Sequence, residues 1–131
     1  MMRRLLFLDF VLLIGFFAGA CSKAPAPTAQ LSDLAGASAS RAGEMVFQTR
    51  CFVCHGREGK GDGHASTGLA ATVRDLTSPA WQDSTSDETI GKVIRSGAAA
   101  VGGTAAMAPN PDLSDAQIYS LTLYIRSLRK E

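Results

Sequence analysis

The sequence predicts an all-α domain, and three observations indicate this fold class. Apolar residues recur at helical spacing in three stretches, two of these stretches open on a capping-box pair, and strand-like alternation of apolar and polar residues is almost absent. At 131 residues the chain has room for one domain, and a targeting segment would make that domain smaller. A cofactor could therefore matter to its core.

The N-terminal end has the layout of a secretory signal peptide. Two arginines precede an almost wholly apolar run at residues 5–17, and the small residues 18–20 follow. The run is too short to span a bilayer, which takes about 20 apolar residues, and Asp9 interrupts it. We therefore expect residues 1–20 to be removed and the protein to be exported.

Cys21 follows the small residues directly, which resembles the lipobox of bacterial lipoproteins, where this thiol is acylated. Ala18 stands where the lipobox prefers leucine, and ordinary signal cleavage also fits residues 18–20. A leftover thiol in an oxidising compartment nevertheless needs a use. The sequence predicts lipidation at Cys21, with a periplasmic location and attachment to a membrane through the lipid.

Residues 21–39 are predicted to be a flexible tether, because their Ala, Pro, Ser and Thr offer little apolar surface to bury. The remaining domain is expected at residues 40–131. Removal of residues 1–20 takes two of the 13 basic and one of the 12 acidic residues, so the mature chain is formally neutral. This balance argues against a nucleic-acid partner and against strong electrostatic steering.

The first helix is expected from about Ser40 to Arg50. Gly43, Val46, Phe47 and Arg50 lie near one face at helical spacing. A glycine inside a helix costs roughly 1 kcal/mol relative to alanine. Gly43 therefore predicts that another backbone passes close to this helix.

The second helix is expected to begin at a capping box, Thr85 with Glu88, and to end at Gly97. Its apolar face is formed by Ile90, Val93 and Ile94. These start, face and stop signals agree on one amphipathic helix.

The third helix opens on a second capping box, Ser114 with Gln117. Its apolar stripe consists of Ile118, Leu121, Ile125 and Leu128. It closes with cations that suit the helix dipole, at Arg126, Arg129 and Lys130. Between the second and third helices, residues 98–112 form a loop of small residues, glycines and prolines. Loops of this length are usually functional or disordered.

The chemistry of the sequence is concentrated in the C-x-x-C-H motif, from Cys51 through Cys54 to His55, the signature of covalent haem attachment. Two thiols three positions apart on a turn can add to the two vinyl groups of one porphyrin. The adjacent imidazole then lies under the iron. Because the motif occurs once, the sequence predicts one covalent haem c.

Three other interpretations of this motif are open. A thioredoxin-type redox disulfide would need a βαβ pattern, which the sequence lacks. A four-coordinate zinc site would need further ligands, and only His64 and Cys21 remain. A chance occurrence is the third, but export favours haem because its covalent attachment occurs outside the cytoplasm.

Over residues 40–130 the chain resembles the small class I cytochromes c. Gly43 and Phe47 match the Gly-x-x-x-aromatic pattern of the family's first helix, and CFVCHGREGKGDG matches its haem segment. DLTSPAWQ resembles its middle loop, and LSDAQIYSLTLYIRSL its last helix, where Tyr124 takes the aromatic position. The resemblance implies the cytochrome c fold, with three core helices around one haem and the first and last helices crossing at the glycine.

The resemblance also implies roles for single residues. Met107, in the loop before the last helix, corresponds to the second axial ligand of iron, opposite His55. Trp81 matches a tryptophan near a haem propionate, although core packing would also explain it, and His64 is expected at the surface. Residues 71–73 lack the proline whose carbonyl accepts a hydrogen bond from the iron-binding histidine in relatives, and any backbone carbonyl could substitute for it.

The sequence therefore predicts an electron carrier rather than an enzyme. His55 and Met107 together would leave no coordination position for a substrate, and methionine would raise the midpoint potential relative to two histidines. The alternative is a haem-based ligand sensor or a peroxidase-like protein with a labile sixth ligand. The expected partners are other redox proteins, which the chain meets as a monomer or as a subunit of an oxidoreductase complex.

Overall fold

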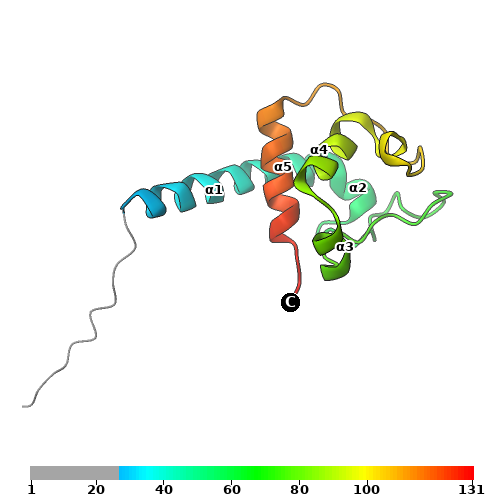
Figure 1. Ribbon diagram of the computed structural model, residues 1–131. Coiled ribbons are helices and arrows are strands. Elements are labelled where there is room, and N and C mark those ends of the chain that lie inside the picture. The colour runs from blue at the N-terminus through cyan, green and yellow to red at the C-terminus, as the bar shows by residue number, and fades with distance from the viewer. Residues whose placement is uncertain (1–26) are drawn as a thin grey trace, which may run out of the picture.

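The computed structural model describes residues 27–131, and the regular secondary structure in that range is entirely helical (Figure 1). The elements in chain order are α1 (Pro27–Val46), the π-helical turn η1 (Phe47–Cys51), α2 (Phe52–His55), α3 (Pro79–Ser84), α4 (Asp87–Ser96), the 3₁₀ turn η2 (Ala98–Val101) and α5 (Asp115–Ser127). The prediction of an all-α domain is confirmed for this part of the chain. The predicted signal peptide and Cys21 lie outside the described residues.

α1 and α5 cross in close contact at Gly43 (Figure 1). A Cβ atom added to Gly43 would lie 1.9 Å from the carbonyl oxygen of Ser120 and 2.8 Å from the backbone nitrogen of Leu121. Because both atoms belong to the backbone of α5, only a glycine permits this approach. The prediction that another backbone passes close to Gly43 is therefore confirmed.

An apolar cluster fills the space between the crossing helices, α4 and the segment before α3. Its buried members are Phe47, Leu76, Ile90, Ile94, Leu113, Ile118, Leu121, Tyr124 and Ile125. The ring centroids of Phe47 and Tyr124 lie 5.2 Å apart, and that of His55 lies 6.3 Å from Phe47. The apolar core therefore extends as far as His55, the predicted iron ligand.

α1 begins at Pro27, well before the predicted start at Ser40. The prediction of a flexible tether is therefore wrong for residues 27–39, which form the first half of this helix. Proline suits a first helical position, and a helix already nucleated by the α5 crossing extends at little further cost per residue. Leu31 and Leu34 are 70% and 66% exposed, so burial does not explain the extension. None of the helices within residues 27–131 is long and apolar enough to cross a membrane.

The chain widens into the π-helical turn η1 directly before the cysteines. The backbone N–H of Phe52 donates to the carbonyl oxygen of Phe47, five residues earlier, instead of four. The extra residue rotates the side chains that follow, so Arg50 lies at the surface while Gly43 and Phe47 are buried. The regular α-helix expected up to Arg50 therefore ends at Val46, and η1 follows it.

The predicted start of the second helix is wrong by one residue. Ser86, not Thr85, caps α4, and its hydroxyl oxygen accepts a hydrogen bond from the backbone N–H of Thr89 at 3.2 Å. Thr85 instead ends α3, a short helix that the sequence did not predict. Ser78 caps the start of α3, and its hydroxyl accepts a hydrogen bond from the backbone N–H of Trp81.

Two other predicted helix ends are confirmed. Gly97 terminates α4 with a φ of 80°, a conformation that favours glycine. Ser114 and Gln117 form the reciprocal capping box at the start of α5. The third predicted helix is therefore present with its expected N-terminus.

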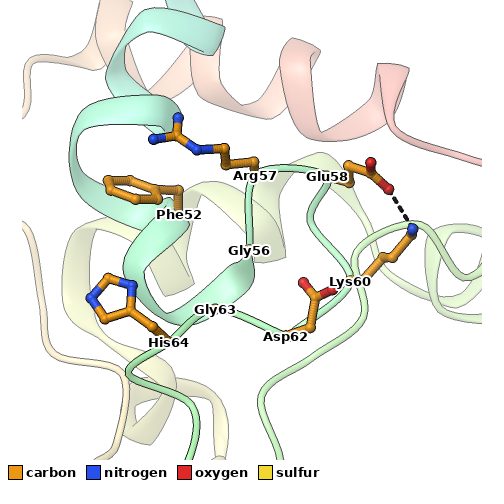
Figure 2. A pocket seen from close by; sticks show the side chains of 8 residues that line it. All are labelled: Phe52, Gly56, Arg57, Glu58, Lys60, Asp62, Gly63 and His64. Carbon is orange, nitrogen blue, oxygen red and sulfur yellow. Dashed lines mark ion pairs between the residues drawn. The ribbon is translucent and has the colours of Figure 1, made fainter.

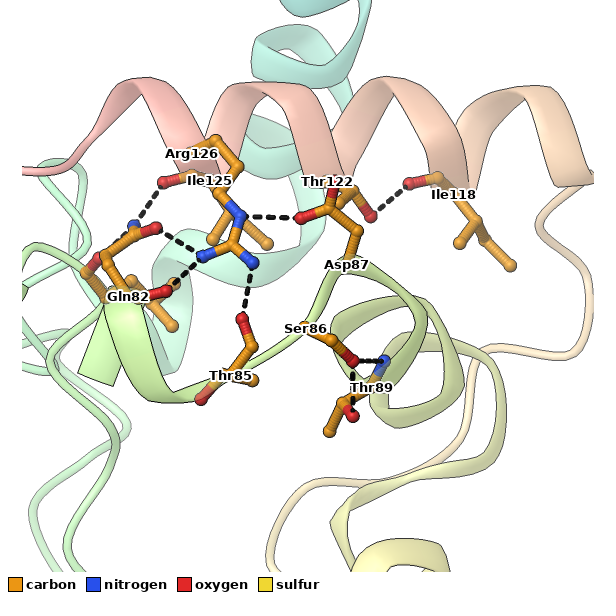
Figure 3. Close-up of polar contacts among 10 residues, drawn as sticks. Gln82, Thr85, Ser86, Asp87, Thr89, Ile118, Thr122, Ile125 and Arg126 are labelled. Carbon is orange, nitrogen blue, oxygen red and sulfur yellow. Dashed lines mark hydrogen bonds and ion pairs between the residues drawn. The ribbon is translucent and has the colours of Figure 1, made fainter. Parts of the chain in front are cut away.

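Arg126 of α5 forms hydrogen bonds to residues of α3 and α4 and to Thr85 between them (Figure 3). Its guanidinium donates to the backbone oxygen and to Oε1 of Gln82, at 2.6 and 2.8 Å, to Oδ1 of Asp87 at 2.6 Å, and to the carbonyl oxygen of Thr85. Gln82 is only 4% exposed, and its amide donates in turn to the carbonyl oxygen of Ile125 at 2.8 Å. This polar network adds to the apolar contacts of Ile90 and Ile118 as a link between α5 and the start of α4.

Candidate functional site

Cys51, Cys54 and His55 lie on one continuous stretch formed by the end of η1 and by α2. Both thiols are half-buried and free of any disulfide. Gly56 ends α2 with a φ of 76°, and its N–H donates to the carbonyl oxygen of Phe52 at 2.8 Å. The structure thus places three of the four predicted haem-binding residues on one short helical segment.

The glycine-rich segment after His55 folds back over this segment and satisfies its carbonyl groups. The N–H of Gly61 donates to His55 at 2.8 Å, and that of Gly63 to Cys54 at 3.1 Å. A Cβ atom at Gly63 would lie 2.4 Å from the carbonyl oxygen of Val53. The final carbonyls of a short helix need such partners, and here the loop supplies them. The glycines therefore hold the haem-attachment motif in shape.

The imidazole of His55 is oriented by a backbone carbonyl. Its Nδ1 lies 3.4 Å from the carbonyl oxygen of Arg74, where Nδ1 can act only as a donor. This tautomer leaves the lone pair of Nε2 for a metal. Burial lowers the pKa of His55, which favours the neutral imidazole that metal binding requires. The accepting carbonyl, which the sequence left open, is that of the residue directly after the segment 71–73.

The properties of the thiols disfavour the redox-disulfide and zinc interpretations. Burial raises the pKa of Cys51 to about 11, whereas reactive redox cysteines have lowered pKa values. Within residues 27–131 there is no strand for a βαβ unit and no group of three or more His, Cys, Asp or Glu side chains that could hold a metal ion. The two thiols and one imidazole instead fit covalent haem attachment.

Met107 lies on a separate loop, between η2 and α5, and its side chain is half-buried. Its carbonyl oxygen accepts a hydrogen bond from the N–H of Ala98 at 3.2 Å, and a Cβ atom at Gly97 would lie 2.8 Å from the same oxygen. Asn110 caps the end of α4, because its Nδ2 donates to the carbonyl oxygen of Ile94 at 3.0 Å. The carbonyl of Met107 is therefore held to η2, and Asn110 on its C-terminal side is held to α4, while residues 102–106 on its N-terminal side are exposed.

A surface hollow of about 340 Å³ lies beside the attachment segment (Figure 2). It is lined by Phe52, Gly56, Arg57, Glu58, Lys60, Asp62, Gly63 and His64. His64 is exposed, as expected, with its ring centroid 6.2 Å from that of Phe52. Neither thiol nor His55 lines the hollow, so it lies apart from the attachment chemistry. Trp81 is half-buried against the apolar cluster.

Sequence reasoning missed the contacts through which other residues support this site. It identified neither the Arg74 carbonyl nor the cap that Asn110 forms on α4. A carbonyl acceptor carries no residue signature, because any residue can supply it. Asn110, between two prolines in a long loop, could have been recognised as a candidate cap from its residue type.

Comparisons with known proteins agree with this geometry. The family model described as Cytochrome c matches residues 40–129. A solved structure titled "KustC0563 c-type cytochrome" is similar with 28% sequence identity and a TM-score of 0.56, over 67% of this chain and 98% of that one. No curated protein shows a significant match.

The match extends over the fold and the attachment motif together. The family binds haem c covalently through a cysteine pair, which is present here as Cys51 and Cys54, and it serves electron transfer. The predicted cytochrome c fold is thereby confirmed for the matched residues. The chain belongs to the cytochrome c family.

Proposed function

We propose that this chain is an exported electron carrier with a single haem c, whose iron is held by His55 and Met107. Family membership supplies the electron-transfer role. The occurrence of one C-x-x-C-H motif supports a single haem. The observation that carries the proposal is the approach of His55 Nδ1 to the Arg74 carbonyl, which leaves Nε2 available to iron.

Each site residue has a distinct task in this function. Haem, when bound, supplies a one-electron couple between ferrous and ferric iron. Cys51 and Cys54 would hold the haem covalently at its edge, and His55 would offer a neutral nitrogen to the iron. The thioether of Met107 favours the ferrous state, so it raises the midpoint potential relative to a second histidine. If His55 and Met107 both held the iron, its oxidation and reduction would need little rearrangement of the protein.

Two features support Met107 as the second ligand. It precedes the last helix, as the ligating methionine does in class I cytochromes c, and its position is held by its own carbonyl, bonded to Ala98, and by Asn110, bonded to α4. Met45, the other methionine within residues 27–131, is 66% exposed on α1. The half-buried Met107 is therefore the better candidate.

Export and membrane attachment belong to the same proposal. The layout of residues 1–20 supports export, and the position of Cys21 directly after them supports a lipid anchor on the periplasmic side. Covalent haem attachment outside the cytoplasm is consistent with this location. The donor and acceptor are other redox proteins, which the chain meets alone or within an oxidoreductase complex.

Replacing Met107 with alanine is expected to abolish the weak far-red band that marks sulfur bound to ferric haem. The midpoint potential is expected to fall, because the ligand that favours ferrous iron is lost. Optical spectra and a redox titration of the two proteins measure both effects. Met45→Ala is the matched control and should retain band and potential.

A wild-type protein without the far-red band would contradict Met107 ligation. The exposure of residues 102–106 gives one reason to test the alternative of a labile sixth position. Carbon monoxide binding to the ferrous wild type at neutral pH would then favour the ligand sensor or peroxidase-like protein. Resistance to carbon monoxide in the wild type, and binding in Met107→Ala, is the result expected of a carrier.

Haem is expected to stay with the polypeptide after denaturation, because two thioether bonds hold it. Intact mass measured under denaturing conditions should equal the mature chain plus one haem. The double variant Cys51→Ala with Cys54→Ala should lose this added mass. His64→Ala removes an exposed imidazole that has no assigned role and should keep it. Haem lost from the denatured wild type would contradict covalent attachment.

A further inference from the structure

One ion pair joins the two segments that carry the proposed iron ligands. Arg50 directly precedes Cys51 in η1, and Asp112 follows Met107 by five positions. Arg50 Nη2 donates to Asp112 Oδ2 at 2.6 Å, across 62 positions of sequence. The haem-attachment segment and the Met107 loop are thus linked directly, on the outside of the fold.

Both ends of this ion pair are attached to well-anchored backbone. On one side, Arg50 lies within η1, where the hydroxyl of the preceding Thr49 donates to the carbonyl oxygen of Val46 at 3.0 Å. On the other side, Asp112 precedes Leu113, a buried member of the apolar cluster that is 4% exposed. A restraint between these side chains therefore acts on both backbones and is not lost in a flexible loop.

Both partners keep their charge around neutral pH. The hydrogen bond from Arg50 lowers the pKa of Asp112, and the same bond raises the pKa of Arg50. The two side chains are 46% and 58% exposed, so the surrounding solvent and salt screen their attraction. The link is consequently modest in strength and adjustable by ionic strength.

We propose that the Arg50–Asp112 ion pair is a clasp that positions Met107 over the haem-attachment segment and slows its displacement by external ligands. This role rests on the proposed ligation by Met107. Neither residue touches iron, so both are positioning residues. Opening the clasp removes the link between the Met107 loop and η1, while Asn110 still holds that loop to α4 and the Met107 carbonyl still accepts from Ala98 in η2.

The clasp is tested by titrating the ferric holoprotein with cyanide, which competes with methionine for the sixth position. Asp112→Asn should bind cyanide roughly two- to five-fold more tightly than the wild type, the range expected for one exposed ion pair. Asp83→Asn is the matched control, because Asp83 pairs with Arg129 at 3.0 Å and similar exposure but contacts neither ligand segment. Its cyanide affinity should equal that of the wild type.

Salt and charge reversal separate a positioning role from a general loss of stability. Raising ionic strength from about 0.01 M to about 1 M should move wild-type cyanide affinity toward that of Asp112→Asn and leave this variant nearly unchanged. Exchanging the charges, as Arg50→Asp with Asp112→Arg, should restore tight methionine ligation. Thermal unfolding should report similar small losses for Asp112→Asn and Asp83→Asn.

The far-red sulfur band distinguishes failure of the clasp from failure of the ligation. A wild type that has the band, with equal cyanide affinity in Asp112→Asn and Asp83→Asn, would overturn the clasp and leave the carrier function standing. A wild type that lacks the band would overturn Met107 ligation and the clasp together. A wild type that has the band, with tighter cyanide binding in Asp112→Asn than in Asp83→Asn, supports both the clasp and Met107 ligation.

Discussion

Replacing Gly43 with alanine is expected to lower the free energy of unfolding of the holoprotein by roughly 3 kcal/mol or more. The new Cβ atom would lie 1.9 Å from the Ser120 carbonyl oxygen and 2.4 Å from its carbon, so no side-chain rotation relieves the clash. α1 and α5 would have to separate along the crossing. Urea unfolding followed by circular dichroism measures the loss.

Gly36→Ala is the matched control on the same helix. A Cβ atom at Gly36 would meet no atom within 4 Å, and alanine favours a helix over glycine by at most about 1 kcal/mol. This variant is expected to leave unfolding unchanged or to stabilise slightly. Equal behaviour of Gly43→Ala and Gly36→Ala would contradict the close backbone crossing.

Replacing Arg126 with methionine is the second change with a large expected effect, a loss of about 2–4 kcal/mol in the free energy of unfolding. The change keeps much of the apolar stem but removes the donors to Gln82, Thr85 and Asp87. The backbone oxygen and Oε1 of the buried Gln82 would lose their guanidinium partner. Chemical unfolding of the holoprotein, with the far-red band recorded in parallel, measures the effect.

Arg129→Met supplies the comparison for Arg126→Met, since Arg129 lies near the same end of α5 and donates to Asp83 at the surface. Exposed ion pairs contribute about 0–1 kcal/mol, so this control should unfold almost as the wild type does. If both arginine variants lost the same small amount, the network that Arg126 forms would not be a support of the fold.

The parts of this structure that could be predicted from sequence are those with a local physical cost or signature. Gly43 is unfavourable in a helix unless a neighbouring backbone requires it, and the structure shows that backbone. Ser114 with Gln117, and Gly97, satisfy helix-end groups within a few residues of themselves. The C-x-x-C-H motif is equally local, so the cysteines and His55 could be located without knowledge of the fold.

The features that sequence reasoning missed depend on distant partners. Thr85 was expected to cap α4, but Arg126, 41 positions away, binds its carbonyl oxygen and Ser86 takes the cap. The π-helical turn at residues 47–51 shifts the helical register, and no spacing rule signals it. Arg50 and Asp112 meet only because the whole fold brings their segments together.

The helical state of residues 27–39 changes what this part of the chain can transmit. As a flexible coil, thirteen residues would span about 20 Å on average with every direction allowed. As a helix they span about the same length, at roughly 1.5 Å per residue, but along one axis. Because that axis continues through Gly43 into the α5 crossing (Figure 1), rotation of the helix at Pro27 turns the haem-attachment segment with it. The first half of α1 therefore sets the orientation of the haem-attachment segment relative to Pro27, whereas a flexible tether would set only the distance between them.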